Sequence, residues 1–295
     1  MIPYDKRSGK IWYNNELVDW ADAKIHILNH GLHYASCVFE GERVYDGSIF
    51  KLEEHTSRLF YSAKRMGITM PYSETEINDA CNKIISVQNI KDGYVRPMAW
   101  RGSEMMAISA QQTKIHVAVA TWDWGSYFDP KLKVNGIMLN ISNWRKPPPN
   151  SIPWDTKASG LYMINTLSKH DAEQQGYTDS LMLDHEGNVA EATGANIFFK
   201  TKDGEIHTPI PDSFLDGITR RTVIEIAKLK TFLQMVSIAL LLTGETGNKI
   251  LNFQDYNAQT IGIILLWLSA FLTLFTGYEY LRKGIDHAMS EDSKK

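Results

Sequence analysis

The stretch Trp154-Asp155-Thr156-Lys157-Ala158-Ser159-Gly160 places one lysine among small residues, directly after a Pro-rich loop over residues 147–153. Small neighbours leave space for a planar ring to approach the lysine amine. An amine that can lose its proton is the nucleophile that imine formation requires. Because an isolated lysine is usually a solvated surface charge, Lys157 indicates a site only if the sequence also supplies its partners.

Two further segments contain groups that suit such a site. Glu191 lies in Val189-Ala190-Glu191-Ala192-Thr193-Gly194-Ala195-Asn196, a small-residue turn between predicted strands, and offers an anion that can hold a pyridine nitrogen protonated. Gly217-Ile218-Thr219-Arg220 opens a predicted helix, where free N–H groups and the helix dipole favour a phosphate. Taken singly, these are a turn carboxylate and a helix N-cap. Together with Lys157 they are candidates for one site.

Length, charge and cysteine content limit the class of protein. A chain of 295 residues can form two domains, each with its own core. Two distant cysteines, Cys37 and Cys81, argue against a disulfide framework and for a reducing compartment, the cytoplasm. A net charge of −3 leaves no basic excess for nucleic acid. The first seven residues contain no apolar stretch, so no signal or transit peptide is predicted there.

Residues 1–121 are predicted to form an N-terminal domain that mixes strands and helices. Lys10 to Val18 holds two short β-rich runs around Asn14-Asn15, which is typical of a hairpin. Apolar residues at helical spacing predict amphipathic helices over residues 55–66 and 74–88. The other predicted strands lie at residues 47–52, 93–100 and 113–121.

A second domain is predicted over residues 134–228. Residues 122–133 contain two Trp together with Gly, Tyr and Pro, a composition that suits an interdomain connection. After it, strands are predicted at residues 134–142, 180–184 and 196–200 and around Val189, and helices at 161–175 and 219–228. The overall prediction is an α+β fold.

The composition changes after residue 228. Residues 231–244 and 261–278 contain no charge, and the second run of 18 residues is long enough for a membrane span. A buried core helix is the alternative. The first run, at roughly 21 Å of helix, falls short of a ~30 Å hydrocarbon core. Basic residues precede the first run and follow the second, so both ends are predicted to be cytoplasmic. We therefore expect an apolar helical hairpin over residues 229–295, with a membrane contact through 231–281.

A series of motifs stands in one order along residues 10–228. They are Leu32-His33-Tyr34, Val38-Phe39-Glu40-Gly41-Glu42-Arg43-Val44-Tyr45, Glu54-His55 with Arg58-Leu59, Tyr94-Val95-Arg96-Pro97, Lys157 with Tyr162, Glu191, and Phe214-Leu215-Asp216-Gly217-Ile218-Thr219-Arg220. This series resembles the branched-chain aminotransferases, which are fold-type-IV pyridoxal-phosphate enzymes. The resemblance implies a two-domain fold with pyridoxal 5'-phosphate as cofactor, a homodimer, and no metal site.

The resemblance also implies roles for the residues near the cofactor. Lys157 would be the Schiff-base lysine and the proton shuttle, Tyr162 would contact the ring oxygen, and Glu191 would pair with the pyridine nitrogen. Arg58 would bind the phosphate together with the helix start at Gly217, Ile218 and Thr219.

For the substrate, the resemblance implies an apolar pocket with a carboxylate site. The predicted pocket walls are Tyr34, Phe39, Gly41, Trp124 and Tyr127, whose ordinary alternative is core packing. The carboxylates of the substrates would contact Tyr94 and Arg96. The implied reaction is transamination between leucine, isoleucine or valine and 2-oxoglutarate. A relative of D-amino-acid aminotransferases or aminodeoxychorismate lyases, which usually differ at the segments around Phe39 and Tyr94, is the alternative.

The resemblance ends near Lys228. Family members continue there with globular chain, including a Gly-Thr-Ala type turn at the phosphate, so the second domain, 134–228, is expected to be a partial cofactor-binding domain. Residues 229–295 instead resemble the last membrane hairpin of bacterial phosphatidylglycerophosphate synthases, on residues 230–235 and 276–281. The metal-binding aspartates of those enzymes are absent, so lipid synthesis is not predicted. An inactive or membrane-tethered fusion, held at the inner face of the cell membrane, is the alternative to an active enzyme.

Overall fold

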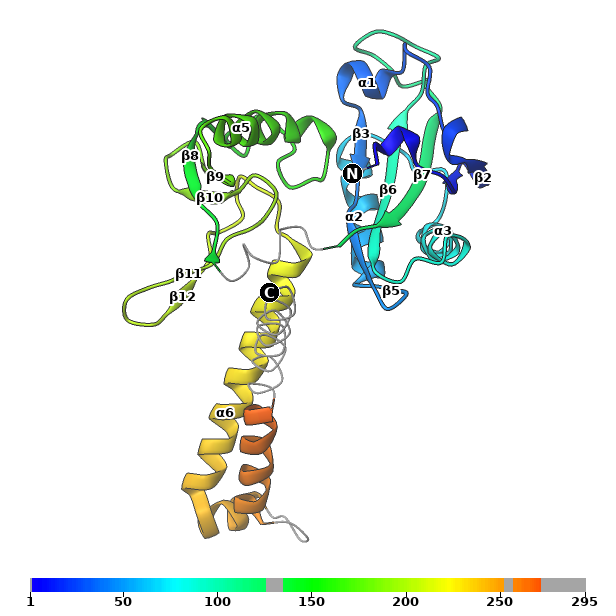
Figure 1. Ribbon diagram of the computed structural model, residues 1–295. Coiled ribbons are helices and arrows are strands. Elements are labelled where there is room, and N and C mark those ends of the chain that lie inside the picture. The colour runs from blue at the N-terminus through cyan, green and yellow to red at the C-terminus, as the bar shows by residue number, and fades with distance from the viewer. Residues whose placement is uncertain (1, 126–134, 252–256, 272–295) are drawn as a thin grey trace, which may run out of the picture. The chain divides into compact units, whose positions relative to one another are not determined.

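The computed structural model describes residues 2–125, 135–251 and 257–271. The chain divides into two compact units, one of Met1–Asp129 with Asn135–Ile218 and one of Pro130–Val134 with Thr219–Lys295. Figure 1 labels their helices and strands. The first unit holds three separate sheets together with several helices, which agrees with the predicted α+β fold.

A seven-stranded antiparallel sheet is built from the first 123 residues, in the order β2-β1-β7-β6-β4-β5, with β3 paired to β6. The predicted hairpin is confirmed, since both residues of its turn, Asn14 and Asn15, have the positive φ (48° and 71°) that a two-residue hairpin favours. The strands are β1 (Lys10–Tyr13), β2 (Glu16–Asp19), β3 (Cys37–Phe39), β4 (Glu42–Tyr45), β5 (Ser48–Ile49), β6 (Gly93–Arg101) and β7 (Ile115–Asp123).

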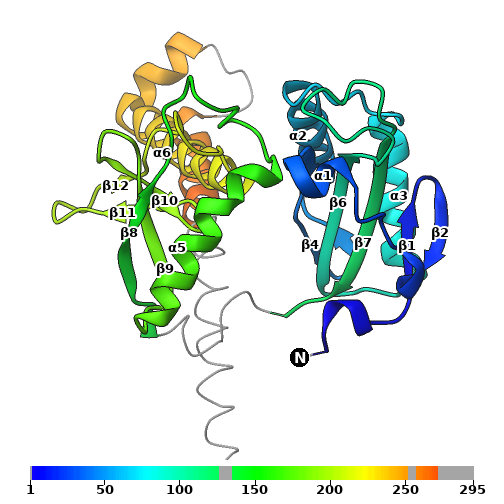
Figure 2. The ribbon, with the colours of Figure 1, turned by 90° about the horizontal axis from the view of Figure 1, so that it is seen from above.

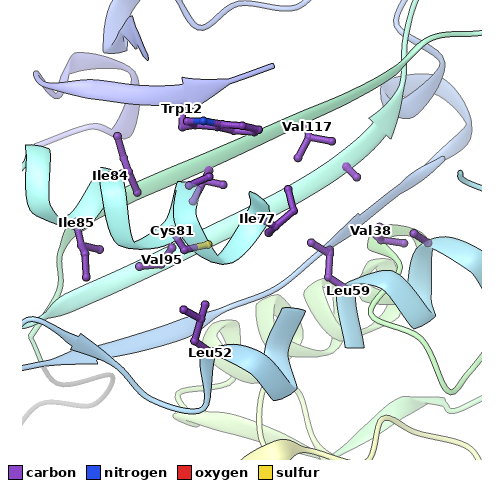
Figure 3. Packing of buried hydrophobic residues seen from close by; sticks show 14 of the residues in the cluster. Trp12, Val38, Leu52, Leu59, Ile77, Cys81, Ile84, Ile85, Val95 and Val117 are labelled. Atoms are coloured by element: carbon purple, nitrogen blue, oxygen red, sulfur yellow. The ribbon is translucent and has the colours of Figure 1, made fainter. Parts of the chain in front are cut away.

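Two helices, α2 (Leu52–Arg65) and α3 (Glu74–Val87), form the core with this sheet. Both were predicted, and a capping box between Ser73 and Glu76 fixes the start of α3. Figure 3 shows the buried side chains between helices and strands, among them Leu59, Ile77 and Val95. Each such side chain contributes about 1.5–3 kcal/mol by leaving water. The short elements are η1 (Tyr4–Lys6), η2 (Trp20–Asp22) and α1 (His30–Tyr34).

The second sheet has three strands, β8 (Leu139–Arg145), β9 (Asp179–Leu183) and β10 (Val189–Ala192). β8 and β9 are parallel, and the crossover between them contains η3 (Ser159–Tyr162) and α5 (Met163–Gln174). Figure 2 shows α5 alongside β8 and β9. The strand predicted over 134–142 begins only at Leu139, after Gly136 with its positive φ of 78°. A small hairpin of β11 (Phe199–Lys200) and β12 (Ile206–His207) follows.

From Thr219 onward, the long helix α6 (Ile218–Leu251) belongs to the second unit. The helix predicted over 219–228 does not end there, and the boundary that we placed after residue 228 falls inside α6. The physical reason is that residues 219–243 contain neither Gly nor Pro to interrupt the helix. The apolar run that seemed too short is therefore part of a 26-residue helical stretch, Ile218–Thr243, whose most apolar window has a mean hydropathy of 1.5, and the stretch is long and apolar enough to cross a membrane.

A shorter apolar helix, Ala258–Phe271, packs beside α6 (Figure 1). The Ser237 hydroxyl donates a hydrogen bond to the Gly262 carbonyl at 2.7 Å. A Cβ at Gly262 would lie 3.0 Å from Leu241 Cγ, so the glycine permits this close approach. These two helices form the expected apolar hairpin, although residues 272–278 of the second run lie outside the described residues.

Candidate active site

The backbone of Lys157 is attached to the first sheet and to α2. Lys157 O accepts a hydrogen bond from Phe39 N at 3.1 Å, and Lys157 N donates one to Ser62 Oγ at 3.0 Å. Val38 and Ala158 form an isolated antiparallel bridge. The lysine segment therefore extends the sheet at β3, which fixes where the side chain begins.

The loop before the lysine is held on α2 as well. Tyr61 donates its hydroxyl proton to Asp155, and Arg65 lies 3.3 Å from the same carboxylate. These contacts are two residues before Lys157 and use side chains one turn apart on α2. They restrict the motion of the loop that carries the lysine.

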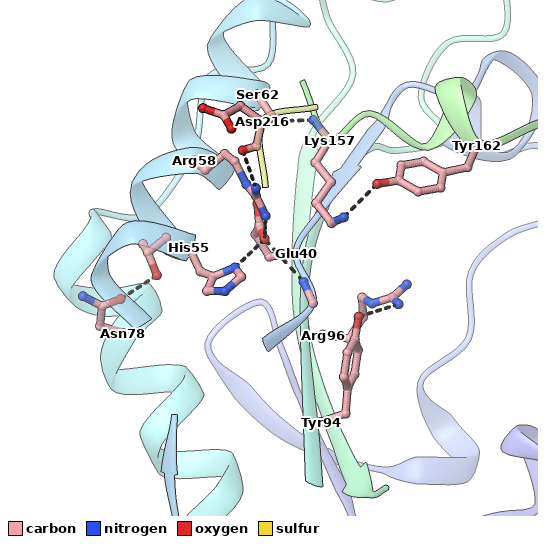
Figure 4. A network of polar contacts seen from close by, with 12 residues as sticks. Glu40, His55, Arg58, Ser62, Asn78, Tyr94, Arg96, Lys157, Tyr162 and Asp216 are labelled. Atoms are coloured by element: carbon pink, nitrogen blue, oxygen red, sulfur yellow. Dashed lines mark hydrogen bonds and ion pairs between the residues drawn. The ribbon is translucent and has the colours of Figure 1, made fainter. Parts of the chain in front are cut away.

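The amine of Lys157 points into a set of aromatic and ionisable groups (Figure 4). Its Nζ donates to the Tyr162 hydroxyl at 2.7 Å and lies 5.0 Å from the centre of the Phe39 ring. Burial lowers the pKa of Lys157, Glu40 opposes this, and Arg58 reinforces it. A lowered pKa increases the fraction of neutral amine, which is the nucleophilic form.

The Tyr162 hydroxyl is the nearest described partner of that amine. Burial, followed by the negative charge of Glu191, raises the pKa of Tyr162 to about 12. The phenol therefore keeps its proton through the neutral range. Its ring packs against Phe39, with the two ring centres 5.0 Å apart.

Glu191 lies in β10 and is buried, with 8% of its surface exposed. Its Oε1 is 2.7 Å from Lys146 Nζ, and its Oε2 accepts from Asn196 Nδ2 at 3.2 Å. Burial raises the pKa of Glu191, and the contact with Lys146 counteracts the rise. The sequence predicted Glu191 but not Lys146 or Asn196. The only signal for Lys146 was its place beside Arg145, directly before the Pro-rich loop.

Arg58, on α2, is oriented by Glu40. Its Nε and Nη2 donate to the two oxygens of the Glu40 carboxylate at 2.7 and 2.8 Å, and His55 Nδ1 is 2.7 Å from Glu40 Oε2 (Figure 4). Burial alone would raise the pKa of Glu40, but the hydrogen bonds from Arg58 and His55 outweigh it and lower the pKa to about 2. Glu40 and His55 stood in the motifs, yet the sequence assigned them no function.

The predicted phosphate-binding segment begins beside Arg58. Arg58 Nη1 lies 3.4 Å from the carbonyl oxygen of Asp216, and Gly217 N donates to Asn196 Oδ1 at 3.1 Å. Ile218 is buried and is the first residue of α6. Thr219 is exposed and belongs to the second compact unit.

Three of the predicted substrate residues, Gly41, Tyr94 and Arg96, meet near Phe39. Arg96 Nη2 donates to the Tyr94 hydroxyl at 3.0 Å, and the guanidinium carbon of Arg96 is 4.5 Å from the centre of the Phe39 ring. A Cβ at Gly41 would lie 1.8 Å from Tyr94 Oη, so only glycine leaves room for this tyrosine. The arrangement presents a guanidinium and a phenol beside an apolar ring, which suits a carboxylate with an aliphatic chain.

The remaining predicted substrate residues are placed differently. The ring of Trp124 packs edge-on against Tyr94 at 4.7 Å. Tyr34 is not among the groups in contact with Lys157 in the described part of the chain, since its ring stacks on His30 at 4.5 Å and 42% of its surface is exposed. Tyr127 lies outside the described residues.

A small cavity of about 30 Å³, partly open to solvent, lies between the glutamate and the tyrosine. Its lining includes Lys146, Asn165, Tyr162, Glu191 and Leu215. The described residues contain no cluster of three or more His, Cys, Asp or Glu side chains that could hold a metal ion. An amine of lowered pKa, a phenol, a buried carboxylate and an oriented guanidinium form the donor set that a phosphorylated pyridine aldehyde requires.

The sequence is similar to a family model and to proteins of known sequence. Residues 37–239 match the model for amino-transferase class IV. A probable branched-chain-amino-acid aminotransferase of Rickettsia conorii is 44% identical over 228 residues, which are 77% of each chain. The branched-chain-amino-acid aminotransferase of Pseudomonas aeruginosa is 42% identical, over 75% of this chain and 73% of the relative.

Solved structures give the same result for the fold. The T.th. branched-chain amino acid aminotransferase with pyridoxamine 5'-phosphate has a TM-score of 0.72 and 36% identity, over 75% of this chain and 74% of that chain. The branched-chain aminotransferase of Thermoproteus uzoniensis with norvaline has a TM-score of 0.71 and 34% identity, over 75% of each chain.

Proposed function

The chain belongs to the amino-transferase class IV family, and we propose that it is a pyridoxal-phosphate enzyme that transfers the amino group of a branched-chain L-amino acid to 2-oxoglutarate. The observation that carries this proposal is the contact of Lys157 Nζ with the Tyr162 hydroxyl at 2.7 Å, beside a cavity that Tyr162 shares with the buried Glu191. Its support is that one lysine, one phenol and one carboxylate stand together in a chain whose relatives are named for this reaction.

When bound, pyridoxal phosphate supplies the carbonyl that exchanges amino groups and a ring that delocalises the electron pair left on the substrate α-carbon when the α-proton is removed. Lys157 Nζ is assigned the bond to that carbonyl and the transfer of the proton at the substrate α-carbon, because burial favours its neutral form. Tyr162 orients the amine through its hydroxyl.

Glu191 is assigned the ring nitrogen, since a buried carboxylate with free lone pairs accepts a hydrogen bond from a protonated nitrogen. Arg58 is assigned the phosphate, together with the backbone at Gly217, Ile218 and Thr219. Glu40 holds the guanidinium in place for this contact. Arg58 Nη1, whose described partner is a backbone carbonyl at 3.4 Å, is the donor best placed to exchange its partner for a phosphate oxygen.

Substrate binding is assigned to the groups around Phe39. Arg96 and Tyr94 would bind a carboxylate, while the rings of Phe39 and Trp124 would enclose an aliphatic side chain. Tyr34 and Tyr127 remain predicted pocket walls on the strength of the resemblance alone.

The test is an absorbance spectrum of the full chain with pyridoxal phosphate, recorded before and after addition of L-leucine, D-leucine or D-alanine. We expect a cofactor band that L-leucine converts to the amine form and that is absent from Lys157→Ala but present in Lys169→Ala. A response to the D-amino acids alone would favour the D-amino-acid aminotransferase alternative. A folded protein that shows no band would favour the inactive fusion.

A homodimer is part of the proposal. Its support, besides the resemblance, is an apolar groove lined by Ile11, Ile25, Leu32 and Trp100, among others, with Ile25 and Leu32 about half exposed. Light scattering of the wild type and of Leu32→Glu tests it: a dimer that the charge converts to a monomer is expected, and a wild-type monomer at all concentrations would contradict it.

The tail is proposed to contact a membrane from the cytoplasmic side. Its support is that α6 is long and apolar, and that only 6% of its most apolar window is buried. The side chains of Phe232, Met235 and Trp267 are also exposed. The resemblance of residues 229–295 to the hairpin of phosphatidylglycerophosphate synthases stays a prediction, because the proteins matched here are aminotransferases. Flotation with phospholipid vesicles, compared between the wild type and Met235→Lys with Leu242→Lys, tests it. Equal recovery of both in the lipid-free fraction would contradict the proposal.

A further inference from the structure

Lys146 is a buried cation with a well-defined set of partners. It lies directly after β8, and 6% of its surface is exposed. Its Nζ is 2.7 Å from Glu191 Oε1 and donates to Asn165 Oδ1 at 2.9 Å. A lysine is rarely buried to this extent unless its charge is paired, so the contact with Glu191 accounts for its place in the interior.

The second partner of Lys146 leads back to the segment that carries the glutamate. Asn165, on α5, donates from Nδ2 to the carbonyl oxygen of Thr193 at 2.7 Å, and Thr193 stands two residues after Glu191. Lys146, Glu191, Thr193 and Asn165 thus form a closed ring of contacts. Neither the amine nor the carboxylate can turn away without breaking this ring, which fixes their mutual geometry.

We propose that Lys146 is a positioning residue, which keeps the buried Glu191 ionised and orients its free lone pairs toward the nitrogen of a bound pyridine ring. The inference rests on the proposed function for its last clause. Lys146 touches Glu191 and is not placed on the substrate, so its effect on the reaction would pass through the carboxylate.

The charge balance explains why a lysine is needed here. Burial favours the protonated carboxyl, in which one oxygen carries a hydrogen and can no longer accept a bond from a ring N–H. Among the described residues, the ionisable groups that act on Glu191 are Lys146 in direct contact, Lys157 at longer range, and Tyr162, whose own ionisation Glu191 opposes. Lys157 cannot replace Lys146 in stabilising the ionised carboxylate, because Lys157 loses its positive charge when its amine deprotonates for catalysis.

Each oxygen of Glu191 keeps capacity for another donor. Oε1 accepts from Lys146 and Oε2 from Asn196 at 3.2 Å, while an ionised carboxylate offers about four lone-pair directions. The pair of contacts therefore fixes the plane of the carboxylate and still leaves a place for a ring N–H. Lys146→Met would remove the charge and keep most of the packing of the side chain.

The test measures the titration of Glu191 in the cofactor-free full chain, by nuclear magnetic resonance of ¹³C-labelled glutamate carboxyls, with the signal assigned by its loss in Glu191→Gln. Lys146→Met, and Lys146→Gln as a second neutral variant, should raise the pKa of Glu191 by about 1–3 units, the effect of losing an opposite charge at contact distance. Lys146→Arg should restore the wild-type titration. Lys169→Met, which removes a lysine of α5 that lies 3.7 Å from Glu173 and 4.0 Å from Asp179 and does not contact Glu191, should leave it unchanged.

An unchanged titration in both neutral variants would overturn the proposal, as would an equal shift in Lys169→Met. Pyridoxal phosphate binding, measured separately on the wild type, distinguishes this result from the proposed function. If the wild type binds no cofactor, the proposed function fails, whereas the titration still decides whether Lys146 controls the ionisation of Glu191.

Discussion

Glu40 accepts hydrogen bonds from both Nε and Nη2 of Arg58, at 2.7 and 2.8 Å, in a position where the carboxylate is fully buried. A planar guanidinium matched by a planar carboxylate is the geometry in which Arg cannot be replaced by Lys without loss. The pair, rather than Arg58 alone, sets the direction of the free edge of the guanidinium. The motif around Phe39 would thus support the proposed phosphate contact through Glu40, which orients Arg58.

Glu40→Gln should make the protein less stable at neutral pH and alter its response to acid. The pKa of Glu40 is lowered in the folded state, to about 2 from 4.5, so its contribution is complete above about pH 4.5 and is lost as the pH falls toward 2. The expected contribution is roughly 3 kcal/mol. Urea unfolding between pH 2.5 and 7 measures it. Parallel stability curves for the two proteins would contradict the assignment.

Glu42 has the opposite behaviour, although it stands two residues away. It is fully buried, and among the described residues neither of its carboxylate oxygens has a hydrogen-bond partner. Burial, followed by the charge of Glu40, raises its pKa well above 4.5, so the folded state retains a proton that the unfolded chain releases. The stability of the wild type should therefore fall as the pH rises above about 4.5.

Glu42→Met should remove this fall and stabilise the protein at pH 8 by about 1–3 kcal/mol, because an apolar side chain of similar size replaces an unpaired polar group. Glu42→Gln separates the two contributions, since it removes the titration but keeps a polar group. Denaturation at pH 5 and pH 8 is the measurement. If the difference in unfolding free energy between the wild type and Glu42→Gln were the same at pH 5 and pH 8, the carboxyl would not titrate as described.

Glu42 also illustrates what the sequence could and could not show. Apolar spacing predicted α2 and α3, and turn residues predicted the hairpin of β1 and β2, because those signals are local. The strands β3 and β4 were not predicted as strands, since the buried Glu40 and Glu42 interrupt the apolar alternation that marks a half-buried strand. Ion pairing and protonation, not hydrophobicity, allow those positions to face the interior.

The candidate site was predictable to the extent that single residues matched motifs. Lys157, Tyr162, Glu191 and Arg58 were named in this way, and their roles stay proposals. Lys146 and Asn165 could not be found from the sequence, because their contacts with Glu191 and Thr193 join positions 45 and 28 residues apart. The length of α6 was underestimated because the change of composition near residue 228 was taken for a structural boundary, although residues 219–243 contain no Gly or Pro to interrupt a helix.

Gly41→Ala should disturb substrate binding more than the fold. The added Cβ would lie 1.8 Å from Tyr94 Oη and would displace the phenol that contacts Arg96. We expect KM for the branched-chain amino acid to rise on the order of tenfold, with a smaller change in the cofactor band. Gly125→Ala is the matched control, because a Cβ there meets no atom within 4 Å. Equal kinetics for the two variants would show that Tyr94 is not held in place by the space at Gly41.

Tyr162→Phe removes the hydroxyl that accepts from Lys157 Nζ while preserving the ring that packs on Phe39. If the hydroxyl orients the amine, kcat/KM should fall on the order of 10- to 100-fold, because a misplacement of about 1 Å at a reacting group can cost about 100-fold. The same substitution makes an independent prediction about stability. Because the folded-state pKa of Tyr162 is raised to about 12, its contribution is complete below about pH 10 and is lost as the pH rises toward 12. Unfolding measured from pH 9 to 11 should show the wild type losing about 1 kcal/mol of stability relative to Tyr162→Phe. Replacement of the partly exposed Tyr177 by Phe is the control and should not remove this loss. If the Tyr162 and Tyr177 variants had the same pH dependence, the buried hydroxyl of Tyr162 would not lie beside Glu191.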